Sequence, residues 1–296
     1  MKKAEILTPV VTAFDAQGNV DKEANRKIYE YLLKGGVDGL VVMGSTGEFF
    51  SMTTEQKKDL IDVAAEFVDK TQVLIGTGGM LADETVELSN YALAKGVKAV
   101  MIVSPYYFQF DEAALEDYYD YVASRIHGDI YIYNFPARTG HDISPALTLR
   151  LARKHANIVG FKDTVTEMGH TRALIDTMKD EFPDFVILSG FEEFMVHNVL
   201  SGGNGCIGGL SNVCPELFRK VADALNKGDL KAMEEGQKAI DQAMTLYDIG
   251  SPFIPIVKEA MILKGLPLVG TCTVPMPKVT DAQIEEIKAW LKNMNI

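Results

Sequence analysis

The sequence alternates along its whole length between short apolar runs and longer amphipathic stretches. The short runs are rich in branched and aromatic residues, which is typical of strands buried in a parallel sheet. They span residues 7–13, 39–43, 72–75, 99–103, 129–133, 158–161, 185–188 and 205–207. Between them, apolar residues recur with the helical period of about 3.6. These stretches span residues 22–35, 55–69, 83–95, 112–126, 145–155, 167–180, 192–201 and 215–227. Eight strand–helix units favour a closed (β/α)₈ (TIM) barrel.

Residues at the ends of these stretches agree with the assignment. Thr53 and Gln56 have the spacing of a capping box, and Ser144 precedes a proline at a helix start. The main alternative is an open, doubly wound sheet. No GxGxxG follows the first apolar run, which disfavours the nucleotide-binding form of that alternative.

In residues 229–296, the apolar pattern predicts three helices, near 229–247, 252–264 and 281–293, with no strands between them. We therefore predict a barrel over residues 1–228 and a C-terminal helical region, packed on the barrel, over residues 229–296.

Charge and composition narrow the classes of partner. The chain has 29 Lys and Arg against 41 Asp and Glu, a formal net charge of −12, which disfavours nucleic acid and anionic lipid. No apolar run is long enough to span a membrane, and no secretory leader is expected. The three cysteines and five histidines show no metal-ligand spacing. The prediction is a metal-free cytoplasmic protein that acts on small molecules.

A lysine and a tyrosine end two successive predicted strands. Lys162 shares a strand face with Gly160, and if that face lines the barrel, the amine is confined and partly desolvated. A neutral amine there can form a Schiff base with a ketone. Tyr133 ends the preceding strand, where a phenol within reach of Lys162 can move protons. The alternatives are a solvated lysine and a packed core tyrosine.

Three further features are candidates for substrate binding. Ser45 and Thr46 lie in a glycine-flanked turn after the second strand, where amides and hydroxyls can hold a carboxylate. Arg138 follows the fifth strand and suits a carboxylate, although a surface arginine is equally consistent. Glu192 follows the seventh strand, and either binds substrate hydroxyls or simply opens the next helix.

These motifs together resemble the dihydrodipicolinate synthase and N-acetylneuraminate lyase family. The resemblance covers nearly the whole chain and rests on GSTGE at 44–48, SPYY at 104–107, YNFPARTG at 133–140 and GFKDT at 160–164. It implies a (β/α)₈ barrel with a C-terminal helical region, assembled as a homotetramer, a dimer of dimers. It also implies a covalent Schiff base of pyruvate and no external cofactor.

The resemblance assigns a role to each matching residue. Lys162 forms the Schiff base, Tyr133 is the general acid and base, and Ser45 and Thr46 hold the pyruvate carboxylate, with Ser45 joining the proton relay. Tyr107 reaches across a dimer interface into the neighbouring site. The substrate pocket is completed by Thr164, Gly190, Glu192 and Ile207.

The sequence has features of several branches of this family, so the aldehyde that reacts together with pyruvate stays open. Residues 75–79, 133–137, 162–164 and 251–253 are similar to the 2-keto-3-deoxygluconate aldolase branch, which predicts cleavage of a 2-keto-3-deoxy sugar acid to pyruvate and an aldehyde. Arg138 is instead similar to an arginine of the 4-hydroxy-tetrahydrodipicolinate synthases, which condense pyruvate with aspartate semialdehyde. The pair Ser45-Thr46 is similar to N-acetylneuraminate lyase. A barrel that binds a 2-oxo acid without turnover is the alternative from another class.

The resemblance also bears on feedback inhibition by lysine, which many synthases show at a small polar pocket. The matching positions here are bulky, apolar or cationic, so we predict no such inhibition. They are Phe49, Phe50, Thr54, Lys57 and Met80.

Overall fold

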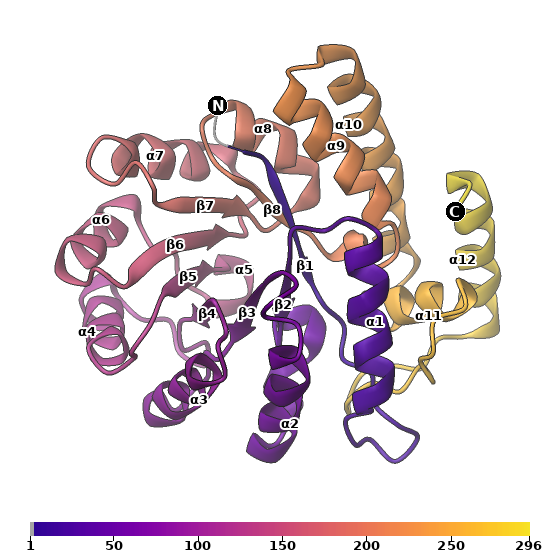
Figure 1. Ribbon diagram of the computed structural model, residues 1–296, viewed down its shortest axis with the longest axis horizontal. Helices are drawn as coiled ribbons and strands as arrows, with labels where there is room; N and C mark the ends of the chain where they lie inside the picture. The colour runs from indigo at the N-terminus through magenta and orange to yellow at the C-terminus, as the bar shows by residue number, and fades with distance from the viewer. Residues whose placement is uncertain (1–2) are drawn as a thin grey trace.

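Eight parallel strands close into one barrel in the computed structural model, which describes residues 3–296 (Figure 1). The strands are β1 (Glu5–Pro9), β2 (Gly39–Val42), β3 (Gln72–Gly76), β4 (Ala99–Val103), β5 (Ile130–Asn134), β6 (Ile158–Asp163), β7 (Val186–Ser189) and β8 (Gly205–Ile207). Each strand pairs with the next along the chain, and β8 pairs with β1. The predicted closed barrel is confirmed, and the open sheet is excluded.

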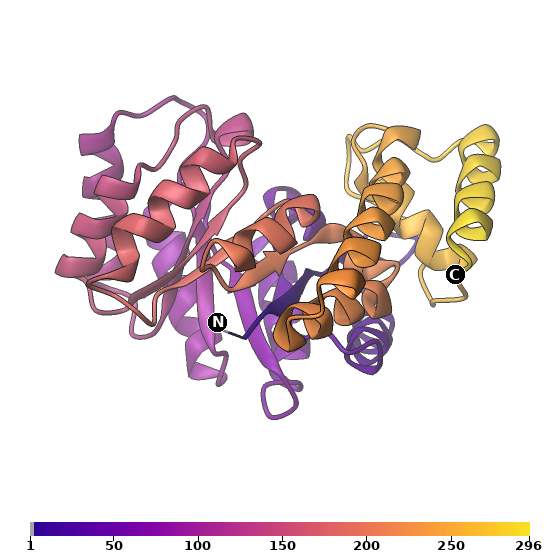
Figure 2. The ribbon, with the colours of Figure 1, turned by 90° about the horizontal axis from the view of Figure 1, so that it is seen from above.

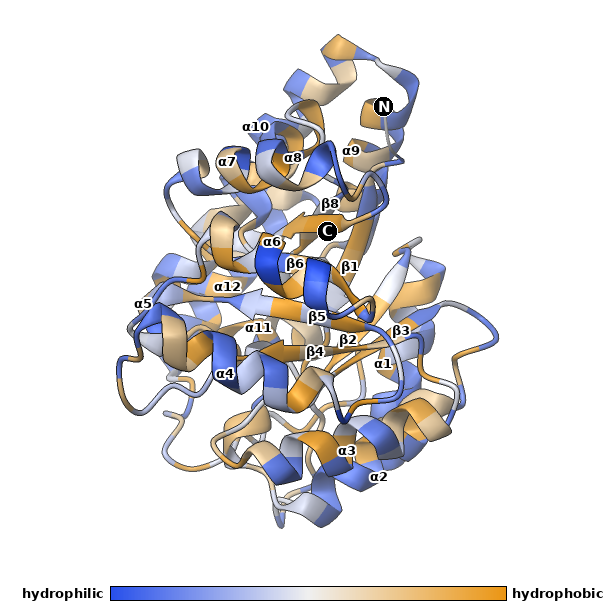
Figure 3. Cartoon of the chain, turned by 90° about the vertical axis from the view of Figure 1, so that its left-hand side faces the viewer, coloured by the Kyte–Doolittle hydropathy of each residue, from blue (hydrophilic) through white to orange (hydrophobic). Residues whose placement is uncertain are grey.

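Helices surround the barrel. They are α1 (Lys22–Lys34), α2 (Thr54–Ala65), α3 (Ala82–Ala94), α4 (Glu112–Ala123), α5 (Pro136–Thr139), α6 (Pro145–Lys154), α7 (Met168–Lys179), α8 (Met195–Leu200), α9 (Pro215–Lys227), α10 (Leu230–Met244), α11 (Ile254–Leu263) and α12 (Asp281–Met294). Short 3₁₀ turns η1 (Ser45–Gly47), η2 (Phe49–Ser51), η3 (Glu192–Phe194), η4 (Gly209–Asn212) and η5 (Thr245–Ile249) lie between them. Figure 3 shows hydrophobic colours along the strands and alternating colours on the helices, as expected for a barrel core covered by amphipathic helices.

The predicted caps are present. Thr53 and Gln56 form a reciprocal capping box at the start of α2, and the Ser144 hydroxyl accepts a hydrogen bond from Leu147 N at the start of α6. The predicted helix over 192–201 is divided into η3 and α8, and α5 was not predicted.

The first strand was predicted over residues 7–13 but spans Glu5–Pro9. Val10 N still donates to Val41 O at 3.0 Å, but beyond Val10 side-chain amides replace the strand ladder: Val11 N donates to Asn212 Oδ1 and Ala13 N donates to Asn25 Oδ1. The apolar residues of this segment are buried, so their pattern resembles a strand although their backbone partners are side chains.

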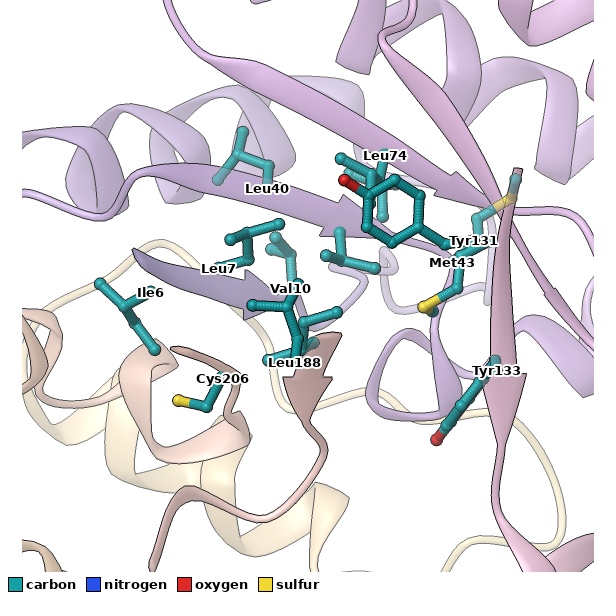
Figure 4. Close-up of a cluster of buried hydrophobic side chains, with 14 of the residues drawn as sticks. Ile6, Leu7, Val10, Leu40, Met43, Leu74, Tyr131, Tyr133, Leu188 and Cys206 are labelled. Carbon is teal, nitrogen blue, oxygen red and sulfur yellow. The ribbon is translucent and has the colours of Figure 1, made fainter. Parts of the chain in front are cut away.

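The barrel interior is packed below the site. Tyr131 lies beside Leu74 on the strand that also carries Tyr133 (Figure 4). A β-carbon on Gly160 would lie 2.5 Å from the Tyr131 ring, so the absence of a side chain at Gly160 makes room for that ring. Gly160 and Lys162 share a strand face, which therefore faces the barrel interior.

The C-terminal helices α10, α11 and α12 gather at one side of the barrel (Figure 2). Helix α10 packs on α9, and α11 contacts η4. The division at residues 228 and 229 into barrel and helical region stays a prediction. In residues 3–296, no helix combines the length and apolarity needed to cross a membrane.

Candidate active site

Lys162 and Tyr133 occupy the same level of neighbouring strands. The two residues are register partners in the β5–β6 pair, near the carboxyl ends of both strands. Lys162 is 4% exposed, and its Nζ lies 4.1 Å from the centre of the Tyr133 ring. Within residues 3–296, no carboxylate oxygen lies within 4.0 Å of this amine. An enclosed amine without an acidic partner has the environment that a Schiff-base nucleophile requires.

The turn that follows β2 delivers a hydroxyl to the same place. Ser45 Oγ lies 3.4 Å from the Tyr133 hydroxyl, which is longer than a typical hydrogen bond between hydroxyls but places the two groups next to each other. Ser45 and Thr46 form η1, and Thr46 is buried. Met43 and Glu48 on either side of this turn have left-handed backbone, with φ of 59° and 61°. The fold thus brings Lys162, Tyr133, Ser45 and the turn that carries Thr46 to one end of the barrel.

A buried polar network lies beside the nucleophile. Asp163 accepts hydrogen bonds from Asn134 Nδ2, His170 Nδ1 and Thr171 Oγ1, at 3.1, 2.9 and 2.6 Å. Although burial lowers the pKa of His170, the hydrogen bond to Asp163 and the nearby carboxylates raise it above its usual value overall. These bonds fix the end of β6, and with it the backbone of Lys162.

Thr164 and Gly190 meet just beyond the strand ends. The Thr164 hydroxyl is buried and has no hydrogen-bond partner in the described part of the chain. Such unpaired buried groups are uncommon and call for an explanation. Gly190 directly follows β7, and its lack of a side chain leaves room for Thr164.

Glu192 is buried, and one of its oxygens is already occupied. Oε1 accepts from Leu210 N at 2.7 Å and from the Tyr247 hydroxyl at 2.8 Å. Burial raises the pKa of Glu192 above its usual value, against the effect of these two donors and of the positive charge of Lys162. Glu192 also begins η3, which agrees with its predicted place at a helix start, whereas binding of substrate hydroxyls stays a prediction.

The other predicted residues differ in placement. Ile207 is buried on β8 as the partner of Leu7 on β1. Arg138 is exposed on α5, and its guanidinium carbon lies 5.6 Å from the centre of the Phe135 ring. Tyr107 is 78% exposed, and its ring packs edge-on against Phe108.

A cavity lies near Tyr107, away from Lys162. It has a volume of about 340 Å³ and is mostly apolar. Its lining is Ala82, Pro105, Phe110, Ala114, Leu115, Asp117, Tyr118 and Tyr121. Pro105 and Phe110 flank the exposed tyrosine in sequence.

The cysteines do not provide a second nucleophile. All three are free, and burial raises the pKa of Cys214 to about 12 and that of Cys272 to about 11. The pKa of Cys206 is also raised by burial. The described residues contain no cluster of three or more His, Cys, Asp or Glu suited to a metal ion.

Two residues around the site were not predicted. Tyr247, which donates to Glu192, comes from η5 in the C-terminal region, and no local pattern marks it. Lys258 is buried and paired with Glu48 of the GSTGE motif. The signal for Lys258 was a single cation inside the apolar stretch Ile254–Leu263.

Comparison with known proteins places these features in context. The model of the dihydrodipicolinate synthetase family matches residues 2–294. A putative 2-dehydro-3-deoxy-D-gluconate aldolase, YagE of Escherichia coli K12, is 35% identical over 292 residues, which cover 98% of this chain and 97% of that protein. A probable 2-dehydro-3-deoxy-D-pentonate aldolase, YjhH of the same strain, is 35% identical over 298 residues, which cover 100% of this chain and 99% of that protein.

A solved structure is similarly close. The crystal structure of YagE from Escherichia coli K12 in complex with pyruvate superposes with a TM-score of 0.95 at 34% identity. The match covers 99% of this chain and 98% of that one. The similarity therefore extends over the barrel and the C-terminal helices alike.

Proposed function

This chain belongs to the dihydrodipicolinate synthetase family, and from that premise we propose that it cleaves a 2-keto-3-deoxy sugar acid reversibly to pyruvate and an aldehyde. The chain is a lyase of this family, which decides against a barrel without turnover. The observation that carries the proposal is the buried amine of Lys162, which forms no ion pair within residues 3–296 and lies beside Tyr133, with Ser45 next to the phenol.

The proposed chemistry uses the amine as an electron sink. Lys162 Nζ attacks the 2-oxo carbon, and loss of water gives an iminium. The bond between C3 and C4 then breaks, its electrons pass to the iminium, and Tyr133 accepts the proton of the C4 hydroxyl as the aldehyde leaves. Protonation of the enamine at C3 and hydrolysis of the imine release pyruvate. Condensation is the same path in reverse, and no external cofactor takes part.

The surrounding residues orient the substrate in this proposal. Ser45 and Thr46, with the backbone of their turn, hold the carboxylate of the 2-oxo acid, and Ser45 continues the proton relay from Tyr133. Thr164 uses its unpaired hydroxyl to bind a substrate oxygen beside Gly190. Ile207 and the second oxygen of Glu192 complete the pocket.

A covalent adduct tests the nucleophile. The protein is mixed with pyruvate, reduced with borohydride and weighed, and the modified peptide is identified. We expect one pyruvate-derived addition on Lys162, absent in Lys162→Ala. Modification of Lys258, the other buried lysine of the described chain, or no adduct at all, would contradict the assignment.

A substrate assay tests the aldehyde partner. We expect release of pyruvate from 2-keto-3-deoxygluconate or from the corresponding pentonate, both named in the relatives above. Turnover of N-acetylneuraminate alone would identify the neuraminate lyase reaction instead.

One observation favours a second candidate, 4-hydroxy-tetrahydrodipicolinate synthase. The Arg138 guanidinium forms no ion pair within residues 3–296 and lies over the ring of Phe135, which itself stacks on Tyr133. A free guanidinium at this place suits the carboxylate of aspartate semialdehyde.

We also propose a homotetramer, a dimer of dimers, in which Tyr107 enters the partner's site. The exposed Tyr107–Phe108 pair and the nearby apolar cavity support this, because isolated monomers rarely expose such surface. Size-exclusion chromatography with light scattering measures the number of subunits. A wild-type protein that is monomeric and fully active would contradict the proposed tetramer. A cytoplasmic location stays a prediction.

A further inference from the structure

The GSTGE turn is tied to the C-terminal region by a buried ion pair. Lys258 on α11 is 1% exposed and Glu48 is fully buried, and Lys258 Nζ lies 2.5 Å from Glu48 Oε1. Lys258 also donates to Thr271 O at 2.8 Å. The second carboxylate oxygen accepts from Thr273 N at 2.7 Å and from Thr273 Oγ1 at 2.9 Å. Glu48 thus has three donors, all from residues 258–273.

Glu48 directly follows the residues proposed to hold the substrate carboxylate. Its backbone N donates to Ser45 O at 3.1 Å, which closes the turn of Ser45–Gly47. Its φ of 61° is a left-handed conformation that non-glycine residues adopt only when their surroundings hold them there. Fixing the Glu48 side chain therefore fixes the end of the turn.

The same end of the turn is also held from the barrel. Thr12 Oγ1, just beyond β1, donates to Gly47 O at 2.7 Å. Ser45 and Thr46 directly precede the two held residues, Gly47 and Glu48, and the Ser45 hydroxyl points to Tyr133. The end of the turn is thus held at Gly47 by the barrel and at Glu48 by the C-terminal region.

We propose that Lys258 is a positioning residue: by holding Glu48, it sets the turn of Ser45 and Thr46 for capture of ketones that carry a carboxylate. The inference rests on the proposed carboxylate-binding role of that turn. Lys258 itself does not touch the substrate, because it is buried and its ammonium donates to Glu48 and Thr271. Removing one partner of a buried pair leaves an unpaired charge, so the turn must move to reach water or another partner.

The test compares two ketones that form the same imine on Lys162. Pyruvate has a carboxylate and hydroxyacetone has none. Each is titrated into the full-length protein, trapped with borohydride and quantified by mass, which gives a half-saturating concentration. We expect Lys258→Met to raise the value for pyruvate on the order of tenfold and to leave that for hydroxyacetone unchanged. An equal rise for both ketones would mean general damage to the site and would overturn the proposal.

Thr273→Val is the milder variant, in case Lys258→Met does not fold. It removes only the hydroxyl bond to Glu48 and keeps the side-chain shape, and we expect a rise for pyruvate alone of about threefold. Lys264→Met is the matched control. Lys264 ends the same helix, donates to Val213 O and the Tyr31 hydroxyl away from the turn, and should leave both titrations unchanged.

Thr46→Val separates failure of this inference from failure of the proposed function. If Thr46→Val weakens pyruvate capture while Lys258→Met and Thr273→Val do not, the turn binds the carboxylate without help from Lys258, and the positioning role is overturned alone. If Thr46→Val has no effect, the carboxylate-binding role of the turn is overturned, and the positioning role fails with it. If the wild type forms no adduct, the proposed function itself fails.

Discussion

Thr164 stands in the space that a side chain at position 190 would occupy. A β-carbon built on Gly190 would lie 1.8 Å from Thr164 Oγ1 and 2.6 Å from Thr164 Cβ. The strand ends of β6 and β7 therefore approach each other through this pair. The hydroxyl at the point of contact is buried and unpaired in the described chain, although groups of this kind normally find a partner.

Thr164→Val should separate stability from activity. A buried hydroxyl without a partner costs about 1–3 kcal/mol, and valine has nearly the same shape, so we expect the free energy of unfolding in urea to stay level or rise by about 1 kcal/mol. If the hydroxyl binds substrate, kcat/KM falls about tenfold in the same variant. A loss of stability with unchanged kcat/KM would contradict this account.

Gly190→Ala provides the steric counterpart. The added methyl group must displace Thr164, and we expect the unfolding free energy to fall by about 1–3 kcal/mol. Pyruvate-adduct formation should weaken in parallel, because Thr164 directly follows β6, the strand that carries Lys162. A variant with wild-type stability would show that the strand ends separate more easily than the contacts indicate.

Tyr133→Phe should remove proton transfer and leave the fold intact. General acid–base groups contribute about 10²- to 10⁴-fold, so we expect kcat for aldol cleavage to fall by at least about 100-fold. Tyr131→Phe is the matched control, because Tyr131 lies on the same strand, deeper in the barrel interior (Figure 4). Equal losses in both variants would argue for a packing effect rather than proton transfer.

The barrel and the centre of the site were predictable because their signals are local. An alternating pattern of apolar runs predicts strands. Tyr133 ends such a run, Lys162 directly follows one, and Ser45 is the second residue after another. Parallel strands place these ends at one edge of the barrel. The geometry then confirmed that Ser45, Tyr133 and Lys162 come together, whereas their catalytic roles stay predictions.

The contacts to the C-terminal region were not predictable in this way. Glu192 is engaged by Tyr247, and Glu48 by Lys258, which is 210 residues away. Such pairs depend on where α11 and η5 pack against the barrel, and no short pattern encodes that placement. The first strand was predicted to be too long for a related reason. Only the folded structure shows that the side chains of Asn25 and Asn212 bind the backbone of the segment after the strand.

Arg138→Ala distinguishes the two substrate proposals. Its guanidinium is exposed, so in a sugar-acid aldolase we expect kcat/KM to change by less than about fivefold, or about 1 kcal/mol. In a synthase, the same variant should lose most activity with aspartate semialdehyde, and Arg138→Lys should restore it only partly because lysine cannot bind bidentately. Steady-state kinetics with both substrates decides between these outcomes.

Lysine should not inhibit the enzyme. The predicted insensitivity rested on bulky and cationic residues, and their arrangement supports it: Lys57 Nζ lies 3.3 Å from Glu84 Oε1, and Thr54 Oγ1 donates to the same oxygen at 2.9 Å. Phe49 and Phe50 lie shortly before Thr54 in the sequence, and their rings pack edge-on against each other. We expect unchanged rates in millimolar lysine, and inhibition at micromolar or low millimolar concentration would refute the prediction.

His141 ties together the two ends of the segment that carries Tyr107. Its Nε2 lies 2.8 Å from Ser104 Oγ, and its Nδ1 accepts from Phe110 N at 3.3 Å. Nδ1 can accept only in the neutral ring, so Nε2 carries the proton and donates to Ser104. Burial lowers the pKa of His141 below its usual value, against the opposing charge of Asp142.

This shift predicts a pH dependence of stability. The unfolded ring binds a proton near pH 6.5, whereas the folded ring resists protonation until a lower pH. The contribution of His141 is therefore complete above about pH 6.5 and is lost as the pH falls through its folded pKa. The variant His141→Leu lacks this titrating group. The difference in unfolding free energy between wild type and His141→Leu should therefore shrink as the pH is lowered from 7.5 to 5, because only the wild type loses stability through this ring. His127→Gln, at an exposed histidine, is the matched control and should show a constant difference. A constant deficit in His141→Leu as well would mean that the ring holds this segment by packing alone.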